Sequence, residues 1–185
     1  MNTLDEKLWM ISQRRAAAYS EERYKEFEAE LNAFYLEAQD DDQRFSATSM
    51  LADHYHQTKA DGRALAAIRQ SITIFPERVE AWLALAEHFH YYQINLDEAA
   101  SAIEVALQKA IVENCQVRQV LGVRIRIALE RGEYGVVNDS LARLVEYKVP
   151  KGGFDVALER DFVSRIPEQT VDEKLLRQYE ALLAT

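Results

Sequence analysis

The stretch Ala52-Asp53-His54-Tyr55-His56 recurs as Ala86-Glu87-His88-Phe89-His90. Each position of the second stretch lies 34 residues after its counterpart, an acid replaces an acid, and an aromatic ring replaces an aromatic ring. All four histidines of the 185-residue chain fall in these two stretches. A fixed internal period of about 20–50 residues is typical of stacked supersecondary units, so the repeat predicts the architecture before any residue is given a role.

The residues around the first stretch predict a pair of helices. The pattern Thr48-x2-Leu51-Ala52-x2-Tyr55 places apolar or small side chains three or four residues apart, which is typical of one helix face. Residues 59–62 form a predicted turn, and Ala64-x3-Ile68 continues into a second helix that ends before Pro76. The first unit is therefore a helix, a short turn and a second helix.

The second unit repeats this pattern as Trp82-x2-Leu85-Ala86-x2-Phe89, with a turn at residues 95–97 and Ala99-x3-Ile103 in its second helix. The distance from Ala64 to Ala99 is 35 residues, so this unit carries one extra residue in its turn. It also lacks a proline at its end.

A third unit is weaker. Its first helix has suitable residues at Leu121, Ile125 and Ala128. Gly132-Glu133-Tyr134 suits the turn and Val137-x3-Leu141 the second helix, whereas Arg124 stands where the pattern has leucine. Over residues 45–147 the three units resemble the tetratricopeptide repeat, whose Trp, Leu, Gly, Tyr, Ala, Phe and Pro positions are matched in spacing and mostly in type.

The resemblance implies an all-α fold, an α-solenoid in which antiparallel helix pairs stack into a right-handed superhelix with extra N- and C-terminal helices. We expect one structural domain overall. Its central part, residues 44–147, would hold three repeats, at 44–77, 78–112 and 117–147. Small residues at the helix contacts would let the two helices of a pair approach closely.

Both ends of the chain are expected to be helical and to cover the stack. Residues 1–43 would form an acidic helical pair, a degenerate repeat with helices at 4–18 and 21–38 and a polar break from Asp40 to Gln43. Residues 148–185 would form capping helices at 154–166 and 172–184, joined at Lys151-Gly152-Gly153. A solenoid needs such atypical ends to bury its terminal apolar faces.

Composition excludes several classes of function. The net charge is −9, of which −6 belongs to residues 1–43, so nonspecific binding to nucleic acid or to an anionic membrane is not expected. The acidic N-terminal residues do not fit a signal peptide, and no apolar run is long enough to span a bilayer, so we expect a cytoplasmic protein. Cys115 is the single cysteine and is expected to act as a small hydrophobe.

A helical wheel assigns the repeated residues to different faces. Successive residues are about 100° apart, so Asp53 and His56 point away from the buried direction, whereas His54 and His88 are expected to pack at a rim or against a neighbouring helix. The resemblance implies a concave groove that holds a peptide of a partner protein. The predicted partner-binding groove consists of Ser49, Asp53, His56, Gln57, Leu83, Glu87, His90, Tyr91 and Arg126.

This groove favours a non-catalytic protein–protein interaction module, an adaptor, scaffold or inhibitor of a partner protein. Its acidic and aromatic lining favours a basic peptide with Lys or Arg. No phosphate-binding, dinucleotide-binding or hydrolase motif is present, and no cofactor is expected. A third hypothesis is self-association through the stacked ends.

The alternative hypothesis is a metal site. Asp53 with His56, and Glu87 with His90, form two acid-x2-His pairs, and mixed nitrogen and oxygen ligands suit Zn²⁺ or Fe²⁺. Equivalent positions on neighbouring helices are separated by about 8–10 Å, which opposes the site. Duplication of an ancestral repeat explains the same pattern without metal, so metal is the weaker hypothesis.

Overall fold

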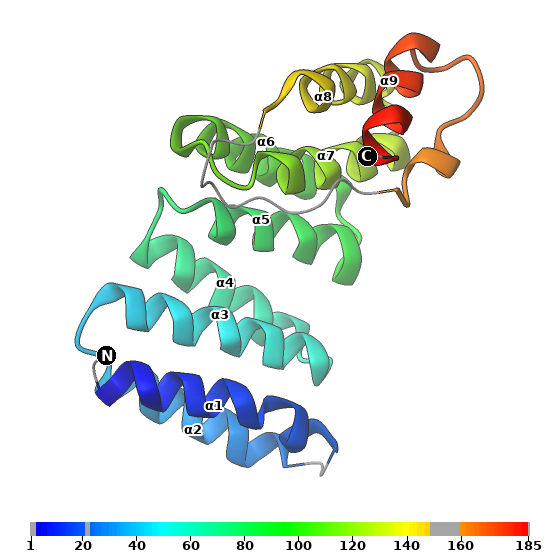
Figure 1. Ribbon diagram of the computed structural model, residues 1–185. Helices are drawn as coiled ribbons and strands as arrows, with labels where there is room; N and C mark the ends of the chain where they lie inside the picture. Colours follow the sequence, from blue (N-terminus) through cyan, green and yellow to red (C-terminus); the bar gives the residue numbers. More distant parts are fainter. Residues whose placement is uncertain (1–2, 21–22, 149–159, 185) are drawn as a thin grey trace. The chain divides into compact units, whose positions relative to one another are not determined.

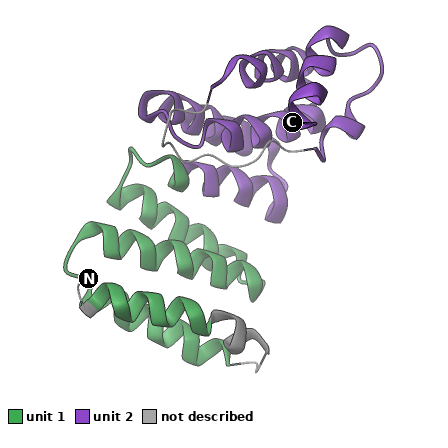
Figure 2. Ribbon diagram, viewed as in Figure 1, with its two compact units in different colours: residues 1–81 green, residues 82–185 purple. Residues whose placement is uncertain are grey.

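The computed structural model describes residues 3–20, 23–148 and 160–184, without the side chains of Thr3 and residues 15–20. Within these ranges the chain is all-helical and contains no strand (Figure 1). It divides into two compact units, Met1–Ala81 and Trp82–Thr185 (Figure 2). Among the described helices, none combines the length and the apolar character that crossing a lipid bilayer requires.

The first unit is built of consecutive helices, each packed on the next. They are α1 (Thr3–Ser20), α2 (Tyr24–Glu37), α3 (Asp41–Gln57) and α4 (Asp61–Ile74). Short connections make neighbouring helices antiparallel, as the blue to green ribbon of Figure 1 shows. The stripe predicted on the second helix is buried, at Phe27, Leu31 and Phe34.

The polar break predicted from Asp40 to Gln43 is instead the start of α3. Asp40 is the N-cap, and its side chain accepts a 2.8 Å hydrogen bond from the backbone N–H of Gln43. The Gln43 side chain is buried and accepts from the Gln39 N–H at 3.0 Å, so two polar residues satisfy backbone donors at the helix start. Their polarity serves capping, and α3 therefore begins at Asp41, within the predicted break.

The second unit is also a series of consecutive packed elements. Its elements are α5 (Val79–Glu87, which begins just before the unit boundary), the π-helical turn η1 (His88–Tyr92), α6 (Leu96–Glu113), α7 (Val117–Arg131), α8 (Tyr134–Glu146), the 3-10 turn η2 (Val163–Arg165) and α9 (Glu173–Leu183). α7 packs between α6 and α8, and α9 packs on α8. The predicted turn at 95–97 is shifted, because Asn95 caps α6 and Leu96 begins it.

The turns of the first and third predicted units have the same backbone geometry. Lys59 and Gly132 both take the left-handed conformation, with φ of +57° and +70°. The residue after each donates back to the last turn of the preceding helix, Ala60 to Tyr55 and Glu133 to Ala128, both at 2.8 Å. This is the Schellman ending, which reverses the chain over a minimal number of residues.

Arg124 replaces the expected leucine of the third unit without leaving the helix interface. Its side chain is only 11% exposed. Nε donates to Glu104 of α6 at 2.6 Å, and Nη1 donates to Asp139 of α8 at 2.7 Å and to the Ser140 hydroxyl at 2.8 Å. The ionic network thus joins α7 to both neighbouring helices where an apolar contact was expected.

The C-terminal prediction is correct for one helix and, over the described residues 160–166, wrong for the other. α9 corresponds to the helix expected at 172–184, and the Asp172 side chain caps it by accepting from the Lys174 N–H at 2.8 Å. The helix expected at 154–166 is not an α-helix over residues 160–166, which form a turn and η2. Ile166 is extended because Pro167 follows it. Residues 149–159, including the predicted Lys151-Gly152-Gly153 joint, lie outside the described ranges.

Candidate functional site

In the compact unit Met1–Ala81, the predicted groove residues lie along one face of α3. Asp53 and Gln57 are exposed, and Ser49 and His56 are half-buried. Their spacing of three and four residues puts them on the same helix face. His54 points elsewhere: it is buried, its ring centroid lies 5.6 Å from that of Phe27 on α2, and its Nε2 lies 3.8 Å from Glu28.

In the compact unit Trp82–Thr185, some of the predicted groove residues are buried and the others are accessible to solvent. Leu83 and His90 are buried, so neither side chain lines an open surface. Glu87 and Arg126 are half-buried, and Tyr91 is exposed. The guanidinium carbon of Arg126 lies 5.9 Å from the centroid of the Tyr91 ring, which brings these two predicted residues of η1 and α7 together.

The acid–histidine pairs fall in different compact units, Asp53 and His56 in Met1–Ala81, Glu87 and His90 in Trp82–Thr185. Each pair alone offers two protein ligands, whereas zinc sites typically use three or four. Across the described ranges, no group of three or more His, Cys, Asp and Glu side chains is placed to hold a metal ion.

The feature that distinguishes the second repeated stretch from the first is the π-helical turn η1. In the first stretch the Ala60 N–H donates to the Tyr55 carbonyl, five residues earlier. In the second, the Asn95 N–H donates to the Phe89 carbonyl, six residues earlier, at 2.8 Å. Tyr55 and Phe89 are equivalent positions, so the extra residue of the 35-residue spacing is located in this turn. A π-helical turn is the way a helix accommodates one additional residue, and such turns are frequent at functional sites.

The residue that closes this turn has a strained backbone. Ile94 takes φ of +45°, as the counterpart of Lys59 and Gly132. A left-handed conformation costs an ordinary residue about 1–2 kcal/mol and is uncommon above all for a β-branched one. The Ile94 side chain is nonetheless 75% exposed, so burial of the side chain does not offset this cost.

Two tyrosines lie beside Ile94 at the surface, and each is backed by a buried histidine. We call Tyr91, Tyr92 and Ile94 the η1 patch; the tyrosines are 50% and 44% exposed. The ring centroid of His90 lies 4.3 Å from that of Tyr91, and the His88 ring stacks on Tyr92 at 6.2 Å. The repeated histidines of this unit therefore support aromatic side chains from beneath.

His90 is in turn connected to the C-terminal segment. Its Nε2 lies 3.1 Å from Oε1 of Glu130 on α7, and Nη2 of Arg165 in η2 donates to the same oxygen at 2.9 Å. Burial raises the pKa of Glu130, but the Arg165 hydrogen bond and the proximity of His90 together outweigh it, so this pKa lies below its ordinary value. The chain His90, Glu130, Arg165 fixes the base of the η1 patch to α7 and η2.

Tyr91 and Arg126 belong to the groove expected from sequence, whereas Tyr92 and Ile94 do not. The 35-residue spacing is the signal that could have located them, because it marks where the second repeat departs from the first.

In comparisons with known proteins, no family model and no curated protein matches this chain.

Proposed function

We propose that the chain is a non-catalytic protein-interaction module that binds a segment of a partner protein through the η1 patch and Arg126. The observation that carries this proposal is the exposure of Tyr91, Tyr92 and Ile94 on a π-helical turn whose buried histidines hold the rings in place. Large apolar side chains exposed close together in the sequence are candidates for an interaction surface, and Tyr and Arg are among the side chains enriched at binding hot spots.

The tetratricopeptide-like solenoid is part of the same proposal. It is supported by alanines that are buried at equivalent positions of the first two predicted repeats. These are Ala52 and Ala64 in repeat 44–77, and Ala86 and Ala99 in repeat 78–112. The shared turn geometry at Lys59 and Gly132 supports it as well. Stacked helix pairs give a rigid scaffold on which a short surface turn can act as a binding element.

The partner segment we propose has an apolar side chain flanked by Lys or Arg. The apolar side chain would cover Ile94 and the tyrosine rings. The basic flank is favoured by the chain's net charge of −9. Complementary charge raises the rate of association and selects among partners.

The test compares two triple variants. Tyr91→Ala, Tyr92→Ala and Ile94→Ala remove the η1 patch, while Leu36→Ala, Ile111→Ala and Val112→Ala remove exposed apolar side chains elsewhere. Proteins captured by the wild type are identified by mass spectrometry, purified and titrated against all three proteins by calorimetry. We expect the patch variant to bind at least tenfold more weakly and the control to bind as the wild type does. Equal affinity of the patch variant and the wild type would refute the proposal.

A further inference from the structure

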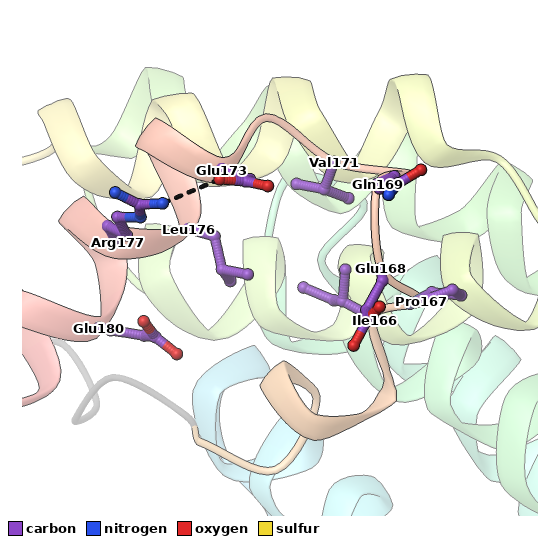
Figure 3. A pocket seen from close by; sticks show the side chains of 9 residues that line it. All are labelled: Ile166, Pro167, Glu168, Gln169, Val171, Glu173, Leu176, Arg177 and Glu180. Carbon is purple, nitrogen blue, oxygen red and sulfur yellow. Dashed lines mark hydrogen bonds and ion pairs between the residues drawn. The ribbon is translucent and has the colours of Figure 1, made fainter.

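A cavity of about 420 Å³ lies at the C-terminal end of the chain, between α9 and the loop that precedes it (Figure 3). We call it the α9 cavity. Its apolar wall consists of Ile166, Pro167 and Val171 from the loop and Leu176 from α9. The loop also contains Gln169, which lines the cavity and takes a left-handed backbone conformation with φ of +63°. Cavities of about 300–1,000 Å³ are the size that small ligands and anchoring side chains occupy.

Carboxylates dominate the polar part of the lining. Glu173 is already used, because Arg177 donates to it at 2.9 Å. Glu168 comes from the loop and Glu180 from α9, and neither carboxylate has a hydrogen bond or an ion pair to any of the residues that the structure describes. Figure 3 shows them on the two elements that bound the cavity. Two uncompensated carboxylates beside an apolar wall create a negative potential there.

A second cavity, of about 620 Å³ and largely open to solvent, adjoins the first. Leu176 and Glu180 line both, so the two cavities meet along one face of α9. The second cavity is bounded mainly by aliphatic side chains, among them Val163 and Leu183. Its one cation, Arg160, donates through Nη2 to the Leu183 carbonyl and so caps the end of α9.

We propose that these two cavities bind a peptide segment of a partner protein, with a Lys or Arg side chain in the α9 cavity and the adjacent apolar side chain in the second. A long basic side chain matches the α9 cavity, because its aliphatic stem can pack on the apolar wall while its charge lies in the negative potential of Glu168 and Glu180. This surface is separate from the η1 patch, and the proposal does not depend on the function proposed there.

The probe is an acetylated, amidated tetrapeptide of alternating leucine and lysine, titrated into ¹⁵N-labelled full-length protein at low salt. We expect chemical-shift changes concentrated in residues 163–184, and none with the matching leucine–glutamate peptide. The double variant Glu168→Gln, Glu180→Gln keeps side-chain size and should bind the lysine peptide at least fivefold more weakly. The control Glu6→Gln, Glu146→Gln changes the net charge equally at exposed sites outside the cavities and should bind as the wild type does.

Three outcomes would overturn the proposal: no shift change with the lysine peptide, equal binding by the cavity variant and the wild type, or equal weakening in the cavity variant and the charge control. The last would mean that net charge alone attracts the peptide. The η1-patch variant serves as the cross-check, because it should retain the shifts in residues 163–184. The two proposals can therefore fail separately.

Discussion

The backbone N–H of Asn95 donates to the carbonyl of Phe89, one residue farther back than the equivalent bond from Ala60 to Tyr55. This single displaced hydrogen bond accounts for the difference between two otherwise matching helix ends. It inserts one residue before the cap, in the π-helical turn that carries the exposed Tyr91 and Tyr92. The second repeat has an exposed aromatic surface where the first repeat has Gln57 and Thr58.

The strain at this turn predicts a gain in stability on one substitution. Ile94→Gly removes a β-branched residue from φ of +45° and gives up little burial, since the side chain is 75% exposed. We expect the free energy of unfolding to rise by about 0.5–1 kcal/mol, the left-handed penalty less the entropy cost of glycine. Urea denaturation followed by circular dichroism measures it.

A substitution that replaces glycine at the equivalent position of another turn provides the matched control. Gly132 has φ of +70° and open space where a Cβ would lie, so Gly132→Ala tests the backbone conformation alone. It should lower the free energy of unfolding by about 1 kcal/mol. A lower stability of Ile94→Gly, or no change in Gly132→Ala, would contradict this account of the turns.

From the contacts of Arg124 we predict that two substitutions at this position lower the free energy of unfolding by different amounts. Arg124→Ala leaves Glu104 and Asp139 without their common partner and creates a void between helices, so we expect a loss of about 2 kcal/mol in the free energy of unfolding. Arg124→Leu restores the side chain of the repeat pattern and should recover at least half of that loss. Chemical denaturation of both variants decides the matter, and equal losses would show that packing at this position is unimportant.

The pair of Glu28 and Arg63 predicts a pH dependence in the first unit. The hydrogen bond from Arg63 lowers the pKa of Glu28 below its ordinary value of 4.5, although burial opposes this. A depressed folded-state pKa stabilises the native protein fully above the unfolded-state pKa, and this contribution is lost as the pH falls through the folded-state pKa. The free energy of unfolding of the wild type should therefore fall more steeply below pH 4.5 than that of Glu28→Gln.

At pH 7, Glu28→Gln should cost about 0.5–1 kcal/mol, because the Arg63 side chain is largely exposed. Denaturation curves of both proteins from pH 7 down to pH 3 give the comparison. Parallel profiles over the whole range would rule out a contribution of Glu28 ionisation to stability.

Arg165 predicts a local effect on the C-terminal segment. Arg165→Ala removes the hydrogen bond that joins η2 to Glu130, so amide hydrogen exchange of residues 160–166 should accelerate at least fivefold while that of α7 changes little. Arg177→Ala is the comparison, because its bond to Glu173 lies within α9 and both side chains are highly exposed. If both variants exchange alike over residues 160–166, Arg165 does not hold this segment.

The sequence predicted the helices well wherever the pattern depended on near neighbours. The apolar spacing of Phe27, Leu31 and Phe34 and the turn at Gly132 were both visible in the order of residue types. Predictions failed at the ends of elements. Asp40 to Gln43 was expected to be a break between helices, although polar residues there can equally cap a helix. Whether they cap one depends on which backbone N–H groups lie within reach of their side chains, and here those of Gln43 and Gln39 do.

The positions of the histidines were likewise predicted correctly in one repeat and incorrectly in the other. Helical geometry correctly separated His54 from His56, because both lie in a regular helix. The same geometry placed His90 at an open surface, but the π-helical turn changes the angle between residues, and His90 is buried against Tyr91 and Glu130. A helical wheel assumes 100° per residue and is therefore unreliable beyond an inserted residue.

By itself, the sequence determined the repeat, the helices and turns of the three repeated units, and the presence of one extra residue in the second repeat. These follow from spacing, since side chains three or four positions apart meet on one helix face. Only the tertiary structure decided that the extra residue forms a π-helical turn, that Arg124 replaces leucine through two carboxylates, and that Arg165 reaches Glu130. The physical reason is that each depends on partners supplied by a different helix or turn, at distances along the chain that no local pattern records.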